Sequence, residues 1–389
     1  MPVHPRHRLD LRPADVGHGL LAVLTARGRR RRERELLALV DAADDGFAAL
    51  SVRAAWELLL AACAWPPGSE VVLSAITHPG MAALVGEAGL VAVPVEVDLD
   101  TLLPDVAALE AVVTDRTRAV LVAQLFGGRA DLSVVAALCR RRGLLLVEDA
   151  AQAWTGPETL RSAADVTLVS FGLLKTATAA GGALVRVADP ALLLRLRRLH
   201  RAWPVQSRLD HAARLLRALA LLLLGEPGAY GAFLLLCRVL GASPGAVLER
   251  ATRTPAPGPG RSARLRPSSA LLVTMARRLS AEDGSPARVR SRTAAGERLR
   301  AVLPDTLRQP GARVSRTHWL FPVRSADPEA LVARLRAAGV DASAATSNLV
   351  ALLPDGPGSD LMRHVVYVPA YPELPPDVRT AVRRVLAEQ

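Results

Sequence analysis

Between Val71 and about Val187 the chain alternates short apolar runs with longer stretches in which apolar residues recur every three or four positions. The short runs predict buried strands, and the longer stretches predict helices with one apolar face. Alternation of this kind predicts an α/β fold with a mostly parallel sheet between helices, and ligands at the carboxyl ends of its strands. We expect strands within 70–77, 91–98, 118–126, 143–150, 165–171 and 182–188, and helices within 79–89, 105–113 and 131–143.

The segment from Pro204 to Gly260 has a different pattern. It contains two apolar stretches of helical length around "GEPGAYG" and ends in "RTPAPGPGRS", which is rich in helix breakers. Each stretch is shorter than the roughly 20 apolar residues that a membrane span needs. We predict an inserted pair of helices that packs on the core or at a dimer interface. The alternative is a hairpin, 205–245, that lies on a membrane surface or holds an apolar substrate.

The pattern changes again after this insertion. Residues 268–304 predict a long, basic, amphipathic helical region, and 318–389 follow the order strand, helix, strand, helix. We therefore divide the chain into three parts. These are a large domain with an N-terminal arm (1–203), the apolar insertion with its Pro/Gly linker (204–260), and a C-terminal part (261–389) that returns a helix to the core and ends in a small α/β domain.

Composition narrows the class of protein. Half of the 389 residues are hydrophobic, so the chain is globular, and a net charge of +12 favours anionic partners such as phosphorylated metabolites. Aromatic residues make up only 3% and are not interleaved with basic ones, which argues against nucleic-acid binding. The basic run at 28–37 predicts a solvated helix face; added attraction to a membrane surface is its alternative.

The three cysteines bear on the cellular compartment. They lie far apart without metal-ligand spacing, which predicts free thiols in a reducing compartment and no metal site. The first residues lack the apolar core of a signal peptide. We expect a cytoplasmic protein, with peripheral contact to the membrane as a further option.

Lys175 is the only lysine in the chain, whereas the other 48 of the 49 basic residues are arginines. Arginine can replace lysine wherever a positive charge is sufficient, but its guanidinium stays protonated. A desolvated lysine can lose its proton and form a Schiff base. The retained amine therefore predicts covalent chemistry at Lys175. The alternative is a surface lysine that has been retained by chance.

Polar residues near Lys175 fit one cofactor. Asp149 ends a predicted strand, Gln152 follows three residues later, and Ser170 lies in the next strand, five residues before Lys175. A carboxylate can pair with a protonated ring nitrogen, and an amide can bind a ring hydroxyl. Amine, carboxylate, amide and hydroxyl groups at adjacent strand ends match the needs of pyridoxal phosphate.

The same residues carry a resemblance to a known family. The run "EDAAQA", followed by "SF", three residues and a lysine, resembles the DegT/DnrJ/StrS aminotransferases. The resemblance covers most of the chain apart from the N-terminal arm and the insertion. It implies the fold type I of pyridoxal-phosphate enzymes, a homodimer, and transfer of an amino group from an amino acid, glutamate or similar, to a keto acceptor. The family often aminates nucleotide-linked keto-sugars.

The resemblance also assigns roles to single residues. Lys175 would bind the cofactor as a Schiff base and, once released, carry the proton of the 1,3-shift. Asp149 would pair with the pyridinium nitrogen, Gln152 would contact the ring hydroxyl, and Ser170 would bind the phosphate. His78 occupies the position of the aromatic residue that stacks on the ring. Its alternative is an ordinary histidine in a loop at a strand end.

The phosphate site departs from the family pattern. Where the family reads Ser-Gly-Thr-Ala-Ala, this chain reads "SVRAA", which places Arg53 and Ala54 at the start of a helix whose N–H groups would face the phosphate. Arg264 stands where the partner subunit of the family offers an asparagine. The two arginines would replace neutral donors with charge-assisted bonds; alternatively they are ordinary surface cations. Thr317, His318 and Trp319 belong to a segment that the family uses near the active site.

Two other functions stay open at this point. A dehydratase would use the same cofactor, but the sugar dehydratases of the family carry histidine in place of the lysine, so Lys175 argues against this reaction. A membrane-associated protein that binds the cofactor without catalysis would use the apolar insertion for its function. Such a protein would not react with amino donors.

Overall fold

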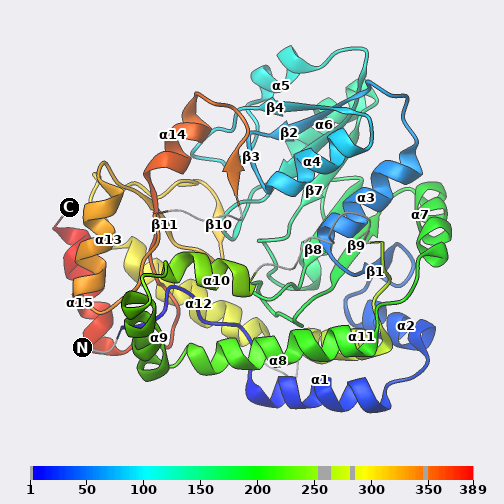
Figure 1. Ribbon diagram of the computed structural model, residues 1–389. Coiled ribbons are helices and arrows are strands. Elements are labelled where there is room, and N and C mark those ends of the chain that lie inside the picture. Colours follow the sequence, from blue (N-terminus) through cyan, green and yellow to red (C-terminus); the bar gives the residue numbers. More distant parts are fainter. Residues whose placement is uncertain (1–2, 253–263, 281–284, 345–348, 389) are drawn as a thin grey trace.

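The computed structural model describes residues 3–252, 264–280, 285–344 and 349–388. A seven-stranded sheet forms its centre, in the order β1-β9-β8-β7-β5-β2-β4 (Figure 1). The five strands from β8 to β4 are parallel, whereas β9 and the edge strand β1 run antiparallel to their neighbours. The strands are β1 (Gly46–Ala49), β2 (Glu70–Ser74), β4 (Val91–Val95), β5 (Thr117–Ala123), β7 (Leu145–Asp149), β8 (Val166–Ser170) and β9 (Ala183–Val187).

The prediction of a mostly parallel sheet is confirmed, and each of the six predicted segments coincides with one of its strands, although β5 begins one residue before its predicted segment. The edge strand β1 was not predicted, because its four residues, "GFAA", lack the β-branched residues that mark a strand. The Pro/Gly linker at 253–260 lies outside the described residues.

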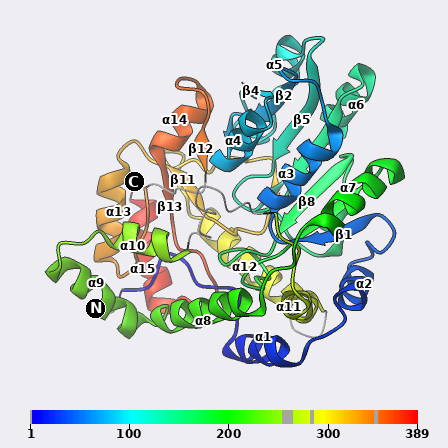
Figure 2. The ribbon, with the colours of Figure 1, turned by 45° about the vertical axis from the view of Figure 1, so that its right-hand side comes forward.

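Helices cover both faces of the sheet (Figures 1 and 2). One face buries its apolar side chains against α3 (Val52–Cys63), α4 (Pro79–Glu87) and α7 (Pro190–Ala202). The other face packs against α5 (Val106–Val112) and α6 (Ser133–Arg142) at one end, and against α2 (Arg29–Leu39) and α11 (Ser269–Leu279) at the other. The sheet is therefore closed to water on both faces, which leaves the ends of its strands for ligands.

The insertion forms two long helices, α8 (Arg208–Leu224) and α9 (Pro227–Val239), followed by α10 (Pro244–Thr252). Helix α8 lies along α1 (Pro13–Thr25) and contacts α11, as both ribbon views show (Figures 1 and 2). Its Leu215 and Ala218 are fully buried, and His211 Nε2 lies 3.1 Å from Thr274 Oγ1 of α11. This face of α8 packs on the core, as the first of the two interpretations predicts.

No single helix in the described part of the chain is long and apolar enough to cross a membrane. Helices α8 and α9 reach the required length only together, as a pair bent by 94°.

The C-terminal part differs from its prediction in one respect. The expected long helix over 268–304 is two helices, α11 and α12 (Ser285–Arg300), and α11 is largely buried rather than exposed on one side. The small domain follows the predicted order except for one further helix, α14, before its second strand; its two strands are antiparallel and it has its own apolar core. Its elements are β11 (Pro322–Arg324), α13 (Pro328–Ala337), α14 (Pro357–His364), β13 (Val365–Tyr367) and α15 (Pro376–Ala387). Short strands pair around it: β3 (Ile76–Thr77) with β12 (Val350–Ala351), and β6 (Gly128–Arg129) with β10 (Ser315–Arg316).

Candidate active site

A cavity of about 430 Å³ lies at the carboxyl ends of the parallel strands. Its walls come from the ends of β5, β7 and β8, from the first turn of α3, and from α8 of the insertion. Six of the side chains predicted to bind the cofactor line this one cavity: Lys175, Asp149, Gln152, Ser170, His78 and Arg53.

Lys175 lies in the loop after β8 and is half-buried. Its Nζ lies 4.3 Å from the centroid of the Trp319 ring, and Trp319 is fixed because its Nε1 donates to the Leu174 carbonyl at 2.7 Å. Burial lowers the pKa of Lys175 to about 8, although the charge of Asp149 acts in the opposite direction. A neutral amine, the form that attacks a carbonyl, is therefore accessible near neutral pH.

Asp149 ends β7 and is only 7% exposed. Burial raises its pKa, while a hydrogen bond from the Ala151 N–H to Oδ1 (3.0 Å) and the charge of Lys175 counteract this effect. Its carboxylate is thus held in a site of low polarity with no direct ion pair among the described residues. A protonated ring nitrogen would supply the missing cation.

The carboxamide of Gln152 has a fixed orientation. Its Oε1 accepts a hydrogen bond from the Phe126 N–H at 2.8 Å. Because a backbone N–H needs an acceptor, the oxygen must face Phe126, and the NH2 group of Gln152 is left to donate elsewhere. The chain after Asp149 forms a turn, in which the Ala153 N–H donates to the Ala150 carbonyl at 3.0 Å, and the side chains of Asp149 and Gln152 both line the cavity.

His78 begins α4. Its Nδ1 accepts a hydrogen bond from the Gly80 N–H at 3.0 Å, so a neutral ring carries its proton on Nε2. A Cβ atom on Gly80 would lie 3.1 Å from this Nδ1 and 3.0 Å from Cδ of Arg53. Because Gly80 has no Cβ atom, the His78 imidazole and the Arg53 side chain can both lie against its backbone at the cavity wall. His78 caps a helix and lines the cavity at the same time.

Two arginines converge on the cavity, Arg53 from α3 and Arg214 from α8. Burial lowers the pKa of both guanidinium groups. For Arg214 the charge of Asp210 acts in the opposite direction, whereas the charges of Arg217 and Arg53 lower its pKa further. Among the described residues neither guanidinium has a hydrogen-bond or ion-pair partner. Two unpaired cations that repel each other in one cavity form a site for an anion, which would bind them through charge-assisted bonds.

The first turn of α3 adds backbone donors to this site. Ser51 caps the helix, and its Oγ accepts from the Ala54 N–H at 3.2 Å, so the Ala54 amide is already used and Ala54 does not line the cavity. Val52 and Arg53 line it, and their N–H groups belong to the first turn, where no intrahelical acceptor exists. Ser170 Oγ accepts from the Gly172 N–H at 3.3 Å, which leaves its hydroxyl proton to donate.

Arg264 lies outside this cavity. Its Nε donates to Oε1 of Glu57 at 2.7 Å, on a part of α3 away from Lys175. A contact between Arg264 and the site of a second subunit stays a prediction.

Of the three residues predicted near the active site, only Trp319 lines the cavity. The N–H of Thr317 donates to the Gly127 carbonyl at 2.8 Å, and the buried His318 pairs through Nε2 with Glu297 at 2.7 Å.

Sequence reasoning missed Arg214, because the insertion was interpreted as a unit separate from the site. The spacing of residues along α8 nevertheless indicates that Arg214 points inward. His211, Leu215 and Ala218 form the buried stripe of this helix, and Arg214 falls on the same side by its spacing of three and four residues. An arginine on an otherwise apolar, inward-facing stripe indicates a buried anion or cavity.

The comparison with known protein families bears on the same part of the chain. The sequence model of the DegT/DnrJ/EryC1/StrS aminotransferase family matches residues 24–211, a range that includes Lys175, Asp149, Gln152 and Ser170. Residues 24–211, just under half of the chain, are therefore similar to this family. The match ends before Arg214, so this arginine comes from the region that the family model does not cover.

Individual relatives agree with this assignment. A "pleiotropic regulatory protein" of Geobacillus stearothermophilus is 41% identical over 87 residues, which are 22% of this chain and 23% of that protein; the chain thus matches about a quarter of its length. The sugar aminotransferase CalS13 from Micromonospora echinospora has a similar structure, with a TM-score of 0.68, 22% identity and 99% of both chains covered. NtdA from Bacillus subtilis, solved with bound cofactor PMP, gives a TM-score of 0.69 at 15% identity and covers 97% of this chain and 83% of its own. These likenesses show the fold-type I architecture.

Proposed function

We propose that this protein is a pyridoxal-phosphate-dependent aminotransferase that transfers an amino group from an amino acid, glutamate or similar, to the carbonyl of a keto-sugar. One observation carries the proposal. In a chain that is similar to an aminotransferase family, the only lysine shares a cavity with a buried carboxylate and two unpaired arginines. These groups match the ring nitrogen and the phosphate of the cofactor.

The residues of the cavity fit this cofactor at both of its ends. For the ring, Asp149 would hold the protonated nitrogen, the NH2 group of Gln152 would donate to the hydroxyl, and His78 would contact one face. The phosphate would bind at the other end, between Arg53, Arg214 and the first turn of α3. Bound pyridoxal phosphate supplies an electron sink for the negative charge that forms when a C–H bond next to nitrogen is broken.

Each residue would then have a defined task. Lys175, with its lowered pKa, can accept a proton from one carbon and return it to another, because it changes protonation state near neutral pH. Trp319 restricts the position of Nζ through its ring. Burial raises the pKa of Asp149 and a neighbouring cation lowers it again, so this carboxylate would favour a protonated ring nitrogen beside it.

The keto-sugar acceptor is the finer part of the proposal. Its support is the likeness to the sugar aminotransferase CalS13 and the resemblance of the sequence to enzymes that aminate keto-sugars. Dehydration of a sugar is the weaker candidate reaction, because the sugar dehydratases of the family carry histidine at the position of Lys175.

An absorption spectrum tests the proposal. Purified protein is mixed with pyridoxal phosphate, and the visible band of the lysine-linked cofactor is recorded before and after the addition of glutamate. We expect the band to form and then to disappear with glutamate. Lys175→Arg is the matched variant, because it keeps the positive charge but cannot form the covalent bond, and it should show no band. A band that is unchanged in Lys175→Arg would disprove the role of Lys175.

Further proposals concern assembly and location. From the family resemblance we propose a homodimer in the cytoplasm, in which Arg264 of each subunit reaches the phosphate site of the other. Sedimentation velocity of the wild type tests the dimer, and weaker cofactor binding by Arg264→Gln tests the contact.

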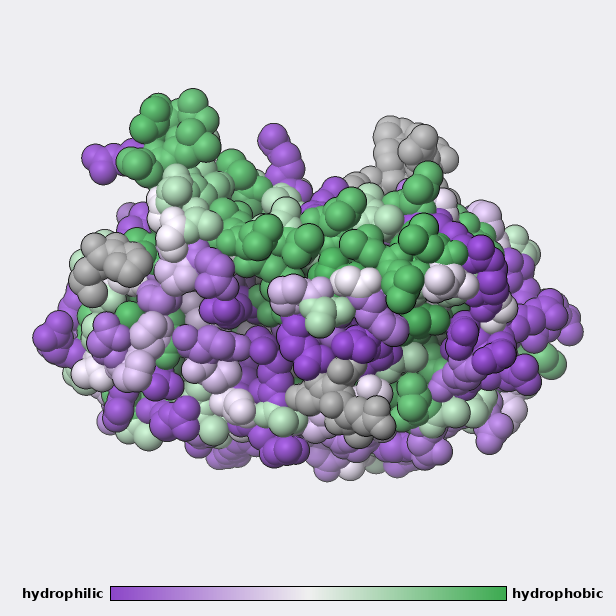
Figure 3. All heavy atoms as spheres, turned by 90° about the horizontal axis from the view of Figure 1, so that it is seen from below, coloured by the Kyte–Doolittle hydropathy of each residue, from purple (hydrophilic) through white to green (hydrophobic). Residues whose placement is uncertain are grey.

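We also propose peripheral contact with a membrane. Its support is an outward stripe on α8, in which Leu209, Leu216 and Leu223 follow each other at intervals of seven and are 79%, 54% and 62% exposed. The face of the molecule drawn in Figure 3 carries a continuous apolar band.

A further inference from the structure

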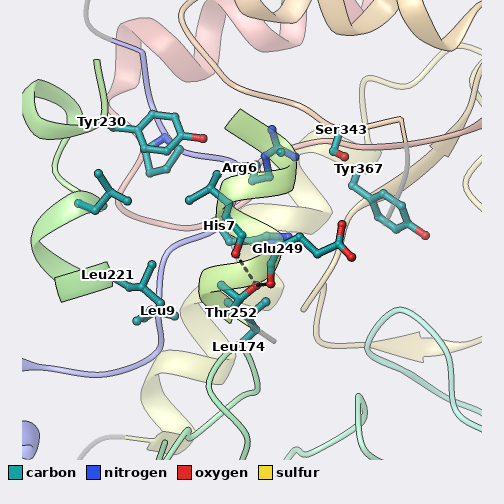
Figure 4. A pocket seen from close by; sticks show the side chains of 15 residues that line it. Arg6, His7, Leu9, Leu174, Leu221, Tyr230, Glu249, Thr252, Ser343 and Tyr367 are labelled. Carbon is teal, nitrogen blue, oxygen red and sulfur yellow. Dashed lines mark hydrogen bonds between the residues drawn. The ribbon is translucent and has the colours of Figure 1, made fainter. Parts of the chain in front are cut away.

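A second cavity, of about 350 Å³, adjoins the Lys175 cavity. Leu174 and Thr252 line both, and Leu174 directly precedes Lys175 in the chain. Figure 4 shows Leu174 and Thr252 on the same side of this second cavity, with Leu9 and Leu221 next to them. The two cavities therefore adjoin at these two residues.

The second cavity is built mostly from parts of the chain outside the family match. The N-terminal arm supplies Leu9, the end of α8 supplies Leu221 and Leu224, and α10 supplies Leu248. Residues 24–211, which match the family, contribute only Leu174. The cavity is therefore a property of the insertion and the arm together.

The lining suits an apolar group. Besides its leucines it contains two polar side chains that are satisfied: the Tyr230 hydroxyl donates to Oδ2 of Asp341 at 2.7 Å, and Arg6 pairs with the same carboxylate at 2.7 Å. The Tyr367 hydroxyl, also in the lining, is buried without a hydrogen-bond partner among the described residues. The pKa of His7 is lowered to about 4 by burial and by the charge of Arg6, so this ring is uncharged at neutral pH. Glu249 is the one carboxylate in the lining. A volume of this size is within the range of small-molecule sites, about 300–1,000 Å³.

The outer surface next to the cavity is apolar as well. Leu223, the neighbour of Leu224, is 62% exposed, and Leu235 and Leu236 of α9 are 62% and 56% exposed. Figure 3 shows apolar side chains gathered over this face of the molecule. A ligand with a hydrocarbon chain could thus approach the cavity along an apolar surface.

We propose that this cavity holds the hydrocarbon tail of the acceptor. The acceptor is then an amphiphile, whose carbonyl-bearing head lies at Lys175 and whose apolar tail lies between the N-terminal arm and α8–α10. This inference rests on the proposed aminotransferase function for the identity of the head, but the tail site is a binding site that can be measured without catalysis.

The first experiment measures tail binding with 11-(dansylamino)undecanoic acid, whose fluorescence rises in an apolar site. Full-length wild-type protein should bind one probe per chain. Leu248→Arg and the cavity-filling Leu248→Trp should each weaken binding at least tenfold. Leu240→Arg, at the residue directly after α9, is the matched control and should bind as the wild type does, since Leu240 is 69% exposed and does not line the cavity.

Several outcomes would overturn the proposal. They are no binding by the wild type, unchanged binding by a folded Leu248→Trp, or an equal loss in Leu240→Arg, which would place the probe on the surface. Lys175→Ala should bind the probe like the wild type. A failure of the proposed transamination therefore leaves this measurement interpretable.

The second experiment connects the tail to the active site. Decyl glucoside, below its micelle concentration, should displace the probe, whereas glucose should not. In protein loaded with pyridoxal phosphate, decyl glucoside should also change the visible absorption of the cofactor, and Leu248→Arg should abolish this change. Displacement without any change in absorption would show that the second cavity is not part of the active site, and the proposal would be wrong.

Discussion

At the scale of the residue, Lys175 depends on two opposed influences. Burial favours its neutral form, and the charge of Asp149 favours its protonated form. The result is a pKa of about 8, well below the ordinary value of 10.5. Such an amine can both donate and accept a proton near neutral pH, whereas an exposed lysine stays protonated there.

The first prediction concerns the pH dependence of Lys175 reactivity. In cofactor-free protein, the rate at which trinitrobenzenesulfonate modifies Lys175 should rise with pH to a midpoint near 8, because only the neutral amine reacts. Asp149→Asn removes the charge that raises the pKa and should move the midpoint to lower pH. Peptide mass spectrometry separates Lys175 from the N-terminal amine. A wild-type midpoint near 10.5 would contradict the role of burial.

The second prediction concerns the two arginines that line the Lys175 cavity, Arg53 and Arg214. Arg53→Gln and Arg214→Gln should each weaken pyridoxal phosphate binding by about thirtyfold, since a hydrogen bond to a charged group is worth about 2 kcal/mol. Arg217→Gln is the matched control, as Arg217 lies on α8 but is exposed. Equilibrium dialysis measures the affinities. Equal affinity for Arg214→Gln and Arg217→Gln would remove α8 from the phosphate site.

At the scale of the element, α8 has two sides with different tasks. Its inward side packs on α1 and α11 and brings Arg214 to the cavity, while its outward side presents leucines to the surface. Deletion of the insertion would therefore remove buried core residues together with the surface. Single substitutions separate the two sides more cleanly.

The third prediction compares two neighbouring leucines of α8. Leu215→Ala should lower the free energy of unfolding by about 2–5 kcal/mol, because Leu215 is fully buried and its loss leaves a cavity. Leu216→Ala should change it by less than about 0.5 kcal/mol, because Leu216 is 54% exposed. Urea unfolding followed by circular dichroism measures both. Similar losses in the two variants would mean that α8 packs differently in solution.

At the scale of the whole molecule, a net charge of +12 is combined with an apolar band on one face. Anionic lipid surfaces attract basic proteins, and exposed leucines gain by insertion into the interface. An amphiphilic acceptor would be met at such a surface, so the proposed membrane contact and the proposed tail site support each other.

The fourth prediction tests the surface. Wild-type protein should co-sediment with vesicles that contain anionic lipids, and the triple variant Leu209→Gln, Leu216→Gln, Leu223→Gln should pellet at most half as much. Val134→Gln, an exposed position on α6, is the control. Equal pelleting of wild type and triple variant would exclude a membrane role for this stripe. A change of oligomeric state in the triple variant would instead identify the stripe as a subunit interface.

The sequence by itself determined the alternation of strands and helices, and it identified the lysine with its carboxylate, amide and hydroxyl neighbours. These features are local. Periodicity within ten residues predicts a strand or a helix, and Asp149, Gln152 and Ser170 lie in strands and turns adjacent to Lys175 along the chain, so a parallel sheet brings their ends together. The break between α11 and α12 could have been predicted, because Gly284 and Pro286 interrupt the helical pattern there.

Only the tertiary structure decided how the distant parts meet. Arg214 reaches the cavity because α8 packs its buried stripe against α1 and α11, and the second cavity exists because the N-terminal arm and α10 close over Leu174. The spacing along α8 places Arg214 on the inward side of the helix, but it does not say which segments that side meets, since each contact joins segments that are far apart in the chain. Their geometry depends on packing of side chains between helices, which local patterns of hydrophobic residues do not specify.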